Sequence, residues 1–141
     1  MISKLLACST LVLSMSVFAA PDWTKVANVN MGTVFLDRAS VTSAGKYLSV
    51  RILRNYDHLV TLGNDPVTNE IWYPHRSVNL GYLANCETGK VALESWQMYS
   101  GKFGAGETVW ADRELGSPSF LIPSSNEESS ALIATCSSPG K

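Results

Sequence analysis

The alternation of apolar and polar side chains is clearest in residues 76–99. Apolar residues take every second position there, namely Val78, Leu80, Tyr82, Ala84 and Cys86. A period of two places all of them on one face of a strand, so Cys86 is expected to point toward the core. Residues 87–89 predict a three-residue hairpin loop in which Gly89 is left-handed. Val91–Tyr99 then forms the partner strand, with Ala92, Glu94, Trp96 and Met98 expected on one face.

Shorter apolar runs predict the other strands, Trp23–Ala27, Gly32–Asp37, Lys46–Arg54 and Glu107–Ala111. In the third of these runs Leu48, Val50 and Ile52 alternate with polar positions, which is typical of an antiparallel strand with one solvated face. Residues 28–30 have the composition of a turn and residues 40–45 that of a connection. Residues 55–74 show no clear pattern, and a connection of that length is functional or mobile.

The last predicted element is a helix. Ser124 or Ser125 can cap its start, and Glu127 or Glu128, three residues later, completes a capping box. Leu132, Ile133 and Cys136 fall on one stripe, which is expected to face the sheet. The fold class is therefore α+β, an antiparallel sheet of about five or six strands with a C-terminal helix packed on one face.

The N-terminus has the pattern of an export signal. Lys4 precedes an apolar run that ends in Val17-Phe18-Ala19, which predicts a signal peptide over residues 1–19 and one domain over residues 20–141. The apolar run is shorter than the roughly 20 residues that a membrane-spanning helix needs. Cys8 also fits a lipidation site superficially, but it lies at the beginning of the run rather than at its end.

The net charge narrows the classes of partner, and the cysteine content predicts a disulfide. Without Lys4, 10 of the 11 basic residues remain against 12 acidic ones, a net charge of −2 that argues against nucleic acid or an anionic membrane as partner. Cys86 and Cys136 are the cysteines left after signal removal, and in an exported protein they predict a disulfide. That bond would tie the hairpin to the helix. A reactive free thiol would need an electropositive site, which the sequence does not show.

The sequence contains no pattern typical of catalysis. His58 and His75, with Asp57 and Asp65 nearby, could supply metal ligands only if three of them converged, and their spacing does not direct them to one point. Neither a nucleophile elbow nor a catalytic Ser-Lys pair is present. We therefore expect no enzyme activity, no catalytic residues, no metal and no cofactor.

Aromatic and basic side chains gather just before the strand that begins at Arg76. The group consists of Trp72, Tyr73, His75 and Arg76. Interfaces are enriched in such residues, so this group is the candidate binding site for a protein partner. The alternative is that Trp72 and Tyr73 only cover an edge of the core.

The order of these features resembles the bacterial surface-adhesin protein E family. The resemblance rests on Trp23, Leu36-Asp37, Arg76-Ser77-Val78 before Cys86, Tyr99-Ser100-Gly101, Val109-Trp110 and a terminal helix ending at Cys136. It implies a non-catalytic protein-binding module, located in the periplasm or on the outer surface of a Gram-negative bacterium. If the protein is surface-displayed, it implies binding to host matrix or serum proteins such as laminin, vitronectin or plasminogen. The alternative is a periplasmic envelope protein that binds or inhibits another protein.

Overall fold

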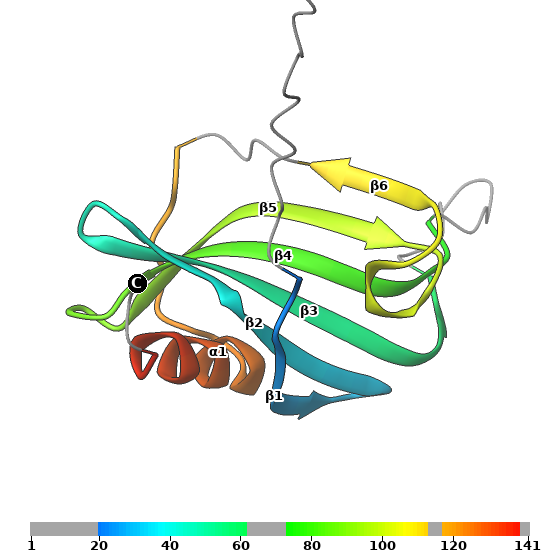
Figure 1. Cartoon of the computed structure of the whole chain (residues 1–141), viewed down its shortest axis with the longest axis horizontal. Coiled ribbons are helices and arrows are strands. Elements are labelled where there is room, and N and C mark those ends of the chain that lie inside the picture. The colour runs from blue at the N-terminus through cyan, green and yellow to red at the C-terminus, as the bar shows by residue number, and fades with distance from the viewer. Residues whose placement is uncertain (1–19, 62–72, 113–116, 139–141) are drawn as a thin grey trace, which may run out of the picture.

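The computed structural model describes residues 20–61, 73–112 and 117–138 (Figure 1). The predicted signal peptide, residues 1–19, lies outside the described residues, as does Trp72. None of the helices within the described ranges is long and apolar enough to cross a membrane.

Six antiparallel strands form one sheet in the order of the sequence. The elements are β1 (Trp23–Val29), β2 (Gly32–Ala44), β3 (Tyr47–Val60), β4 (His75–Asn85), β5 (Lys90–Tyr99), the short 3₁₀ helix η1 (Lys102–Gly104), β6 (Thr108–Asp112) and the helix α1 (Asn126–Cys136). Every strand pairs with its neighbour along the chain, so the sheet is a meander with β1 and β6 at its two edges (Figure 1). The α+β prediction of an antiparallel sheet, a C-terminal helix and one disulfide is confirmed.

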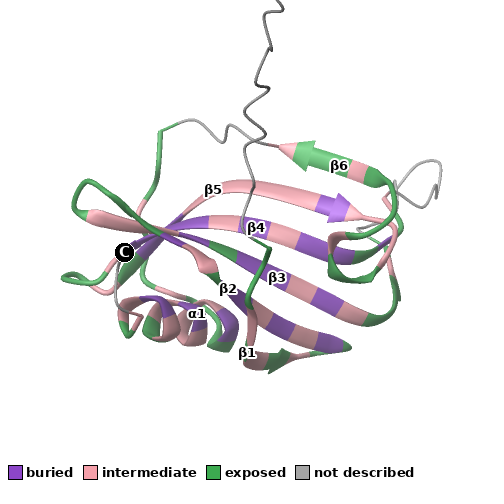
Figure 2. Ribbon diagram, viewed as in Figure 1, coloured by how far each residue is buried: buried purple, intermediate pink, exposed green. Residues whose placement is uncertain are grey.

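The helix packs on one side of the sheet, mainly against β1 and β2, and this side is called the helix side below. The buried core lies there and comprises Val34, Leu36, Val41, Val50, Ile52, Val78, Leu80, Tyr82, Val91, Met98 and Ala131. The predicted alternation in β3 and β4 is therefore correct, as Figure 2 shows along both strands. The other side of the sheet, called the open side below, carries the strand residues that alternate with these core residues.

Several strands are longer than the sequence suggested. The expected connection at 40–45 is wrong, because β2 continues to Ala44 and its residues 42–44 pair with residues 47–49 of β3. The turn expected at 28–30 is displaced, since β1 extends to Val29 and the reversal falls at Asn30 and Met31. The stretch from residue 55 begins as strand, because β3 runs to Val60. The small residues 42–44 form strand because long-range pairing with β3 overrides their local composition.

The expected common face of Ala92, Glu94, Trp96 and Met98 is also wrong. The pairing of β4 with β5 shifts between Gly81 and Tyr82, which leaves Glu94 without an opposite residue. A bulge of this kind reverses the alternation along the strand. Trp96 and Met98 oppose core residues, whereas Ala92 opposes Leu83 on the open side and Glu94 lies at the bulge.

The stripe that helix α1 turns to the sheet matches the expected one only in part, because Leu132 packs against the core but Ile133 does not. The buried residues of α1 are Glu127, Ala131 and Thr135, whereas Ile133 is 66% exposed. Small residues at the contact let the helix lie close, and the Thr135 hydroxyl is satisfied by donating to the Ala131 carbonyl at 2.7 Å. The predicted cap is confirmed, because the Ser125 hydroxyl accepts from the Glu128 N–H at 3.1 Å.

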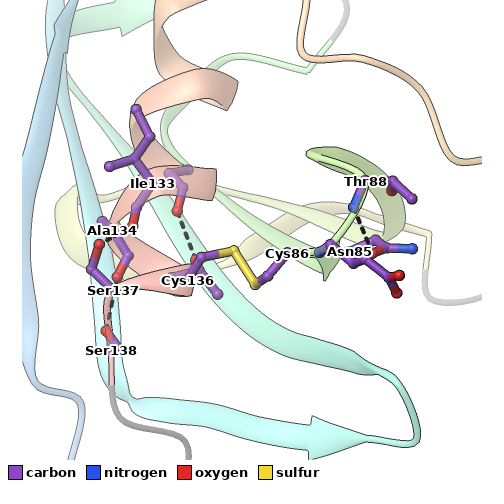
Figure 3. Close-up of a disulfide and its surroundings, with 11 residues drawn as sticks. Asn85, Cys86, Thr88, Ile133, Ala134, Cys136, Ser137 and Ser138 are labelled. Atoms are coloured by element: carbon purple, nitrogen blue, oxygen red, sulfur yellow. Dashed lines mark hydrogen bonds between the residues drawn. A yellow bond between two sulfur atoms is a disulfide. The ribbon is translucent and has the colours of Figure 1, made fainter.

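The disulfide between Cys86 and Cys136 is present, and it joins the turn after β4 to the last residue of α1 (Figure 3). The expectation that both cysteines point into the core is wrong. Cys86 is exposed and Cys136 is half-buried, because β4 ends at Asn85 and Cys86 already belongs to the turn. That turn spans residues 86–89, with Gly89 left-handed as expected at φ 68°, and the Asn85 side chain accepts from the N–H groups of Glu87 and Thr88.

An ion pair links the start of α1 to the centre of the sheet. The Arg54 Nε lies 2.6 Å from the buried carboxylate of Glu127. Burial lowers the pKa of Arg54, but the hydrogen bond and charge of Glu127, together with Tyr56, raise it by more, so the pKa lies above its usual value. Arg54 therefore remains charged, and the pair fixes the position of the helix.

Tyr82 lies beneath the helix, and its ionisation should couple folding to high pH. Burial raises the pKa of Tyr82 from 10.0 to about 12. The unfolded chain therefore ionises first, so the stability contributed by the neutral phenol is complete below pH 10 and is lost as the pH rises toward 12. We expect this loss to be about 2–3 kcal/mol.

Denaturant unfolding between pH 9 and 12 measures this effect, with Tyr82→Phe as the control for the other tyrosines. The variant should lose less stability than the wild type across this interval. Parallel pH curves for the two proteins would contradict the burial of the Tyr82 phenol.

Candidate functional site

The four residues predicted to bind a partner fall in different environments. Trp72 lies outside the described residues. His75 is only 2% exposed, with its Nδ1 2.7 Å from the Tyr73 carbonyl and its ring edge-on to Tyr56. Tyr73 is half-buried, and Arg76 is exposed. The structure therefore leaves Tyr73 and Arg76 available at the surface, whereas His75 supports the chain beneath them.

Tyr73 belongs to an aromatic patch, defined here as Tyr73, Trp96 and Trp110. Its ring centroid lies 4.9 Å from that of Trp110, which is 38% exposed on the edge strand β6. Trp110 opposes Met98 of β5, and Trp96 is half-buried two residues before Met98. These rings lie at the β5–β6 edge of the sheet, whereas α1 packs mainly near the opposite edge (Figure 1). Sequence reasoning placed Trp110 at the end of a strand but not beside Tyr73.

Tyr73 adopts a left-handed backbone with φ 54°. A bulky residue with positive φ is an outlier, and such strain of about 1–3 kcal/mol persists only where surrounding contacts impose it. The contacts here are the Trp110 ring and the hydrogen bond from His75 to the Tyr73 carbonyl. The buried His75 therefore holds Tyr73 in position.

The open side carries a second candidate surface, a hollow of about 430 Å³ over β3, β4 and β5. Its main polar lining consists of Arg51, Asn79, Glu94, Ser95, Gln97 and Tyr99. Gly81 opposes both Arg51 and Ser95 in the sheet, and its lack of a side chain leaves space between them. We call this the open-side hollow.

The loop after β5 lies on the open side next to this hollow. The Phe103 N–H donates to the Asn55 side chain at 2.8 Å, and the Gly104 N–H donates to the Ser77 hydroxyl at 2.9 Å. The Phe103 ring packs on Phe35 with centroids 5.3 Å apart, yet half of Phe103 stays exposed. This glycine-rich stretch was visible in the sequence, but its anchors on β3 and β4 are long-range contacts.

A buried carboxylate borders the open-side hollow. Asp37 is 0% exposed and forms an ion pair with Arg51, whose guanidinium also lies 5.7 Å from the Trp23 ring centroid. Arg51 binds the Oδ2 atom of Asp37, and the Oδ1 atom of Asp37 accepts from the N–H groups of Asp22 at 2.9 Å and Ala39 at 3.1 Å. This network positions Arg51 and neutralises its charge.

The histidines and aspartates of the described residues do not come together as a metal site. Across residues 20–61, 73–112 and 117–138, no cluster of three or more His, Cys, Asp or Glu side chains could hold a metal ion. Of the histidines and aspartates considered as ligands, His75 is buried, His58 and Asp57 are exposed on β3, and Asp65 lies outside the described residues.

Comparison with known proteins identifies the family. The model of the Surface-adhesin protein E family matches residues 23–137, and no curated protein matches the chain. The fold is similar to the crystal structure of protein E from non-typeable Haemophilus influenzae, with a TM-score of 0.54 and 15% identity over 88% of this chain and 81% of that chain. A second crystal form of Haemophilus influenzae protein E gives a TM-score of 0.53 and 16% identity over 86% of this chain and 96% of that chain. This chain is therefore an adhesin-like protein and belongs to the Surface-adhesin protein E family.

Proposed function

We propose that this protein is displayed on the outer surface of a Gram-negative cell and binds a host matrix or serum protein without catalysis. Residues 1–19 would direct export and be removed, leaving the domain that begins at residue 20. The aromatic patch and Arg76 would form the binding surface. The observation that carries this proposal is the exposed Trp110 ring packed against Tyr73 at the uncovered edge of the sheet.

The composition of this surface supports protein binding. Tryptophan, tyrosine and arginine dominate the energetics of protein interfaces, because large rigid side chains bury much area at little entropic cost. Trp110 is pre-positioned by Tyr73, which reduces the cost of ordering it on binding. The edge strand β6 is short, only five residues, so side chains rather than strand addition would supply most of the contact.

Surface display is tested by protease treatment of intact cells, with a periplasmic protein as the internal standard. We expect the protein to be digested while the standard is protected. Protection of both proteins would instead favour a periplasmic protein that binds or inhibits an envelope partner, which crosslinking could then identify.

Binding is tested on immobilised laminin and vitronectin with the purified domain. Trp110→Ala and Arg76→Ala should each weaken binding about thirtyfold or more, because truncation of an interface hot spot costs at least about 2 kcal/mol. Arg38→Ala is the matched control, since Arg38 is an equally exposed arginine on β2, near the opposite edge. Equal losses from the two arginine variants would indicate a charge effect, and full binding by Trp110→Ala would place the interface elsewhere.

A further inference from the structure

The open-side hollow has the size of a small-molecule site. Its volume of about 430 Å³ falls within the range of roughly 300–1,000 Å³ typical of ligand pockets. It is built on β3, β4 and β5, the paired centre of the sheet, so its lining is held by backbone pairing rather than by a loose loop.

The lining offers hydrogen bonds but little unbalanced charge. Ser49 and Ser95 contribute hydroxyls, and Asn79 and Gln97 contribute amides, whereas the Ser40 hydroxyl already donates to the Asp37 carbonyl and accepts from the Arg51 N–H. The one basic group, Arg51, is paired with the buried Asp37, so it supplies donors without attracting anions strongly. Glu94 adds a carboxylate acceptor. A ligand that matches this lining must both donate and accept hydrogen bonds and carry no negative charge.

Two further features of the lining suit such a ligand, namely a hydrogen bond that fixes Gln97 and an acceptor on Asn79 that has no partner among the described residues. The Tyr99 hydroxyl donates to the Gln97 carbonyl oxygen at 2.5 Å, which fixes the Gln97 amide and leaves its N–H groups as donors. The side-chain oxygen of Asn79 is buried and has no hydrogen-bond partner among the described residues. An unsatisfied buried acceptor is costly, and it is a feature that binding of a donor group would relieve.

Aromatic surface lies next to these polar groups. A side chain on Gly104 would be within 4.0 Å of both Asn79 and Tyr99, so the loop that carries Phe103 adjoins the hollow. Phe103 holds a left-handed backbone at φ 54° and exposes half of its surface beside Phe35. The hollow itself contains the Tyr99 ring beside its polar floor, and Phe103 lies on the adjoining loop, which suits a ligand with hydroxyl edges and an apolar C–H face.

We propose that the open-side hollow binds a neutral saccharide, a hexose or N-acetylhexosamine unit. Hydroxyl groups donate and accept at once, so they can use the Gln97, Glu94 and serine groups together, while the C–H face of the ring packs against an aromatic side chain. This site lies on the opposite side of the sheet from the aromatic patch, and it stands independently of the proposed protein interface.

The test is a titration of the purified oxidised domain, followed by two-dimensional amide NMR. The probes are galactose, N-acetylglucosamine and their β1,4-linked disaccharide at millimolar concentrations, with N-acetylneuraminic acid as the charged comparison. We expect shifts confined to the hollow, including the amides of Asn79, Gly81, Ser95 and Gln97, with the disaccharide binding more tightly than either sugar. No shifts with any neutral sugar, shifts elsewhere, or tighter binding of the acidic sugar would overturn the proposal.

Substitutions in the lining test whether its side chains bind the disaccharide. Gln97→Ala and Glu94→Gln should each weaken disaccharide binding about five- to tenfold, the loss expected for one or two hydrogen bonds. Glu107→Gln is the matched control, an exposed glutamate outside the hollow, and it should bind as the wild type does. Equal effects of the two glutamate variants would overturn the assignment.

Gly81→Ala keeps the test decisive if Gln97→Ala does not fold. The new methyl group would clash with the movable Ser95 hydroxyl and meet Ser95 Cβ and N at ordinary contact distances of 3.7 and 3.8 Å, so the sheet can accept it while the floor of the hollow rises. The variant should unfold at about the wild-type temperature and lose saccharide binding, and retained binding would overturn the proposal. Trp110→Ala should bind saccharide normally, which separates this result from the test of host-protein binding.

Discussion

Cys86→Ala is expected to lower the free energy of unfolding by about 4 kcal/mol. The disulfide closes a loop with a sequence separation of 50, and opening it returns that loop's conformational freedom to the unfolded chain. The chain-entropy model behind this figure is one account of how disulfides stabilise proteins, and the direction of the effect does not depend on it. For a domain of this size, the melting temperature should fall by roughly 10–20 °C.

The position of the disulfide at the end of α1 is a reason to expect the whole loss of about 4 kcal/mol. Residues 117–125 are the described part of the connection between β6 and α1, and within this part Leu121 pairs with the sheet through two backbone hydrogen bonds to Val91. The helix itself buries small side chains, Ala131 and Thr135, which supply little apolar area. The C-terminal end of α1 therefore depends strongly on Cys136.

Thermal unfolding followed by circular dichroism, with and without reductant, measures the effect. Reduced wild type and Cys86→Ala should melt together, well below the oxidised protein. Thr88→Ala, in the same exposed turn, should stay within about 0.5 kcal/mol of the wild type. An unchanged melting temperature for Cys86→Ala under oxidising conditions would remove the disulfide from the account of stability.

The parts of this fold that follow from local periodicity could be predicted from the sequence. Val78, Leu80, Tyr82 and Ala84 are buried as their alternation indicates, and Ser125 caps the helix as its spacing from Glu128 indicates. Both patterns depend on neighbours within a few residues. The pairing of Cys86 with Cys136 was also predictable, because export and cysteine number leave one simple partner.

Features that depend on a partner strand could not be predicted. The bulge at Glu94 is defined by the register of β5 on β4, and without that register Ala92 seemed to share a face with Trp96. The strand residues 42–44 are too polar to be recognised before they are paired with 47–49. Ile133 seemed to belong inward because it is apolar, but helix position is set by close contact at Ala131 and Thr135.

The candidate surfaces were predictable only in part, for the same reason. Tyr73 and Arg76 could be proposed from their composition, whereas the approach of Trp110 requires β6 to lie beside β5. The open-side hollow brings together β3, β4 and β5, and no local pattern indicates that Gly81 lies between Arg51 and Ser95. Aromatic and glycine residues were visible, but the shape between them results from folding.

Asp37→Ala is expected to destabilise the domain by about 2–4 kcal/mol. The carboxylate is fully buried and joins three parts of the chain. They are the residue before β1, the bulge of β2 where its pairing with β3 shifts between Asp37 and Thr42, and the Arg51 side chain of β3. Removal would leave the N–H groups of Asp22 and Ala39 without their acceptor. Arg51 would lose less, because its side chain is 45% exposed and water can solvate it.

Denaturant unfolding of three variants separates these contributions. Asp37→Asn keeps an oxygen for the two N–H groups but loses the ion pair, so it should cost clearly less than Asp37→Ala. Asp57→Ala is the matched control, because Asp57 is an exposed aspartate on β3, and it should cost no more than about 0.5 kcal/mol. If Asp37→Ala cost no more than Asp57→Ala, the buried network would not be what holds β1 to the bulge of β2. If Asp37→Asn cost as much as Asp37→Ala, the ion pair with Arg51, rather than the hydrogen bonds from the two backbone N–H groups, would account for the stability that Asp37 contributes.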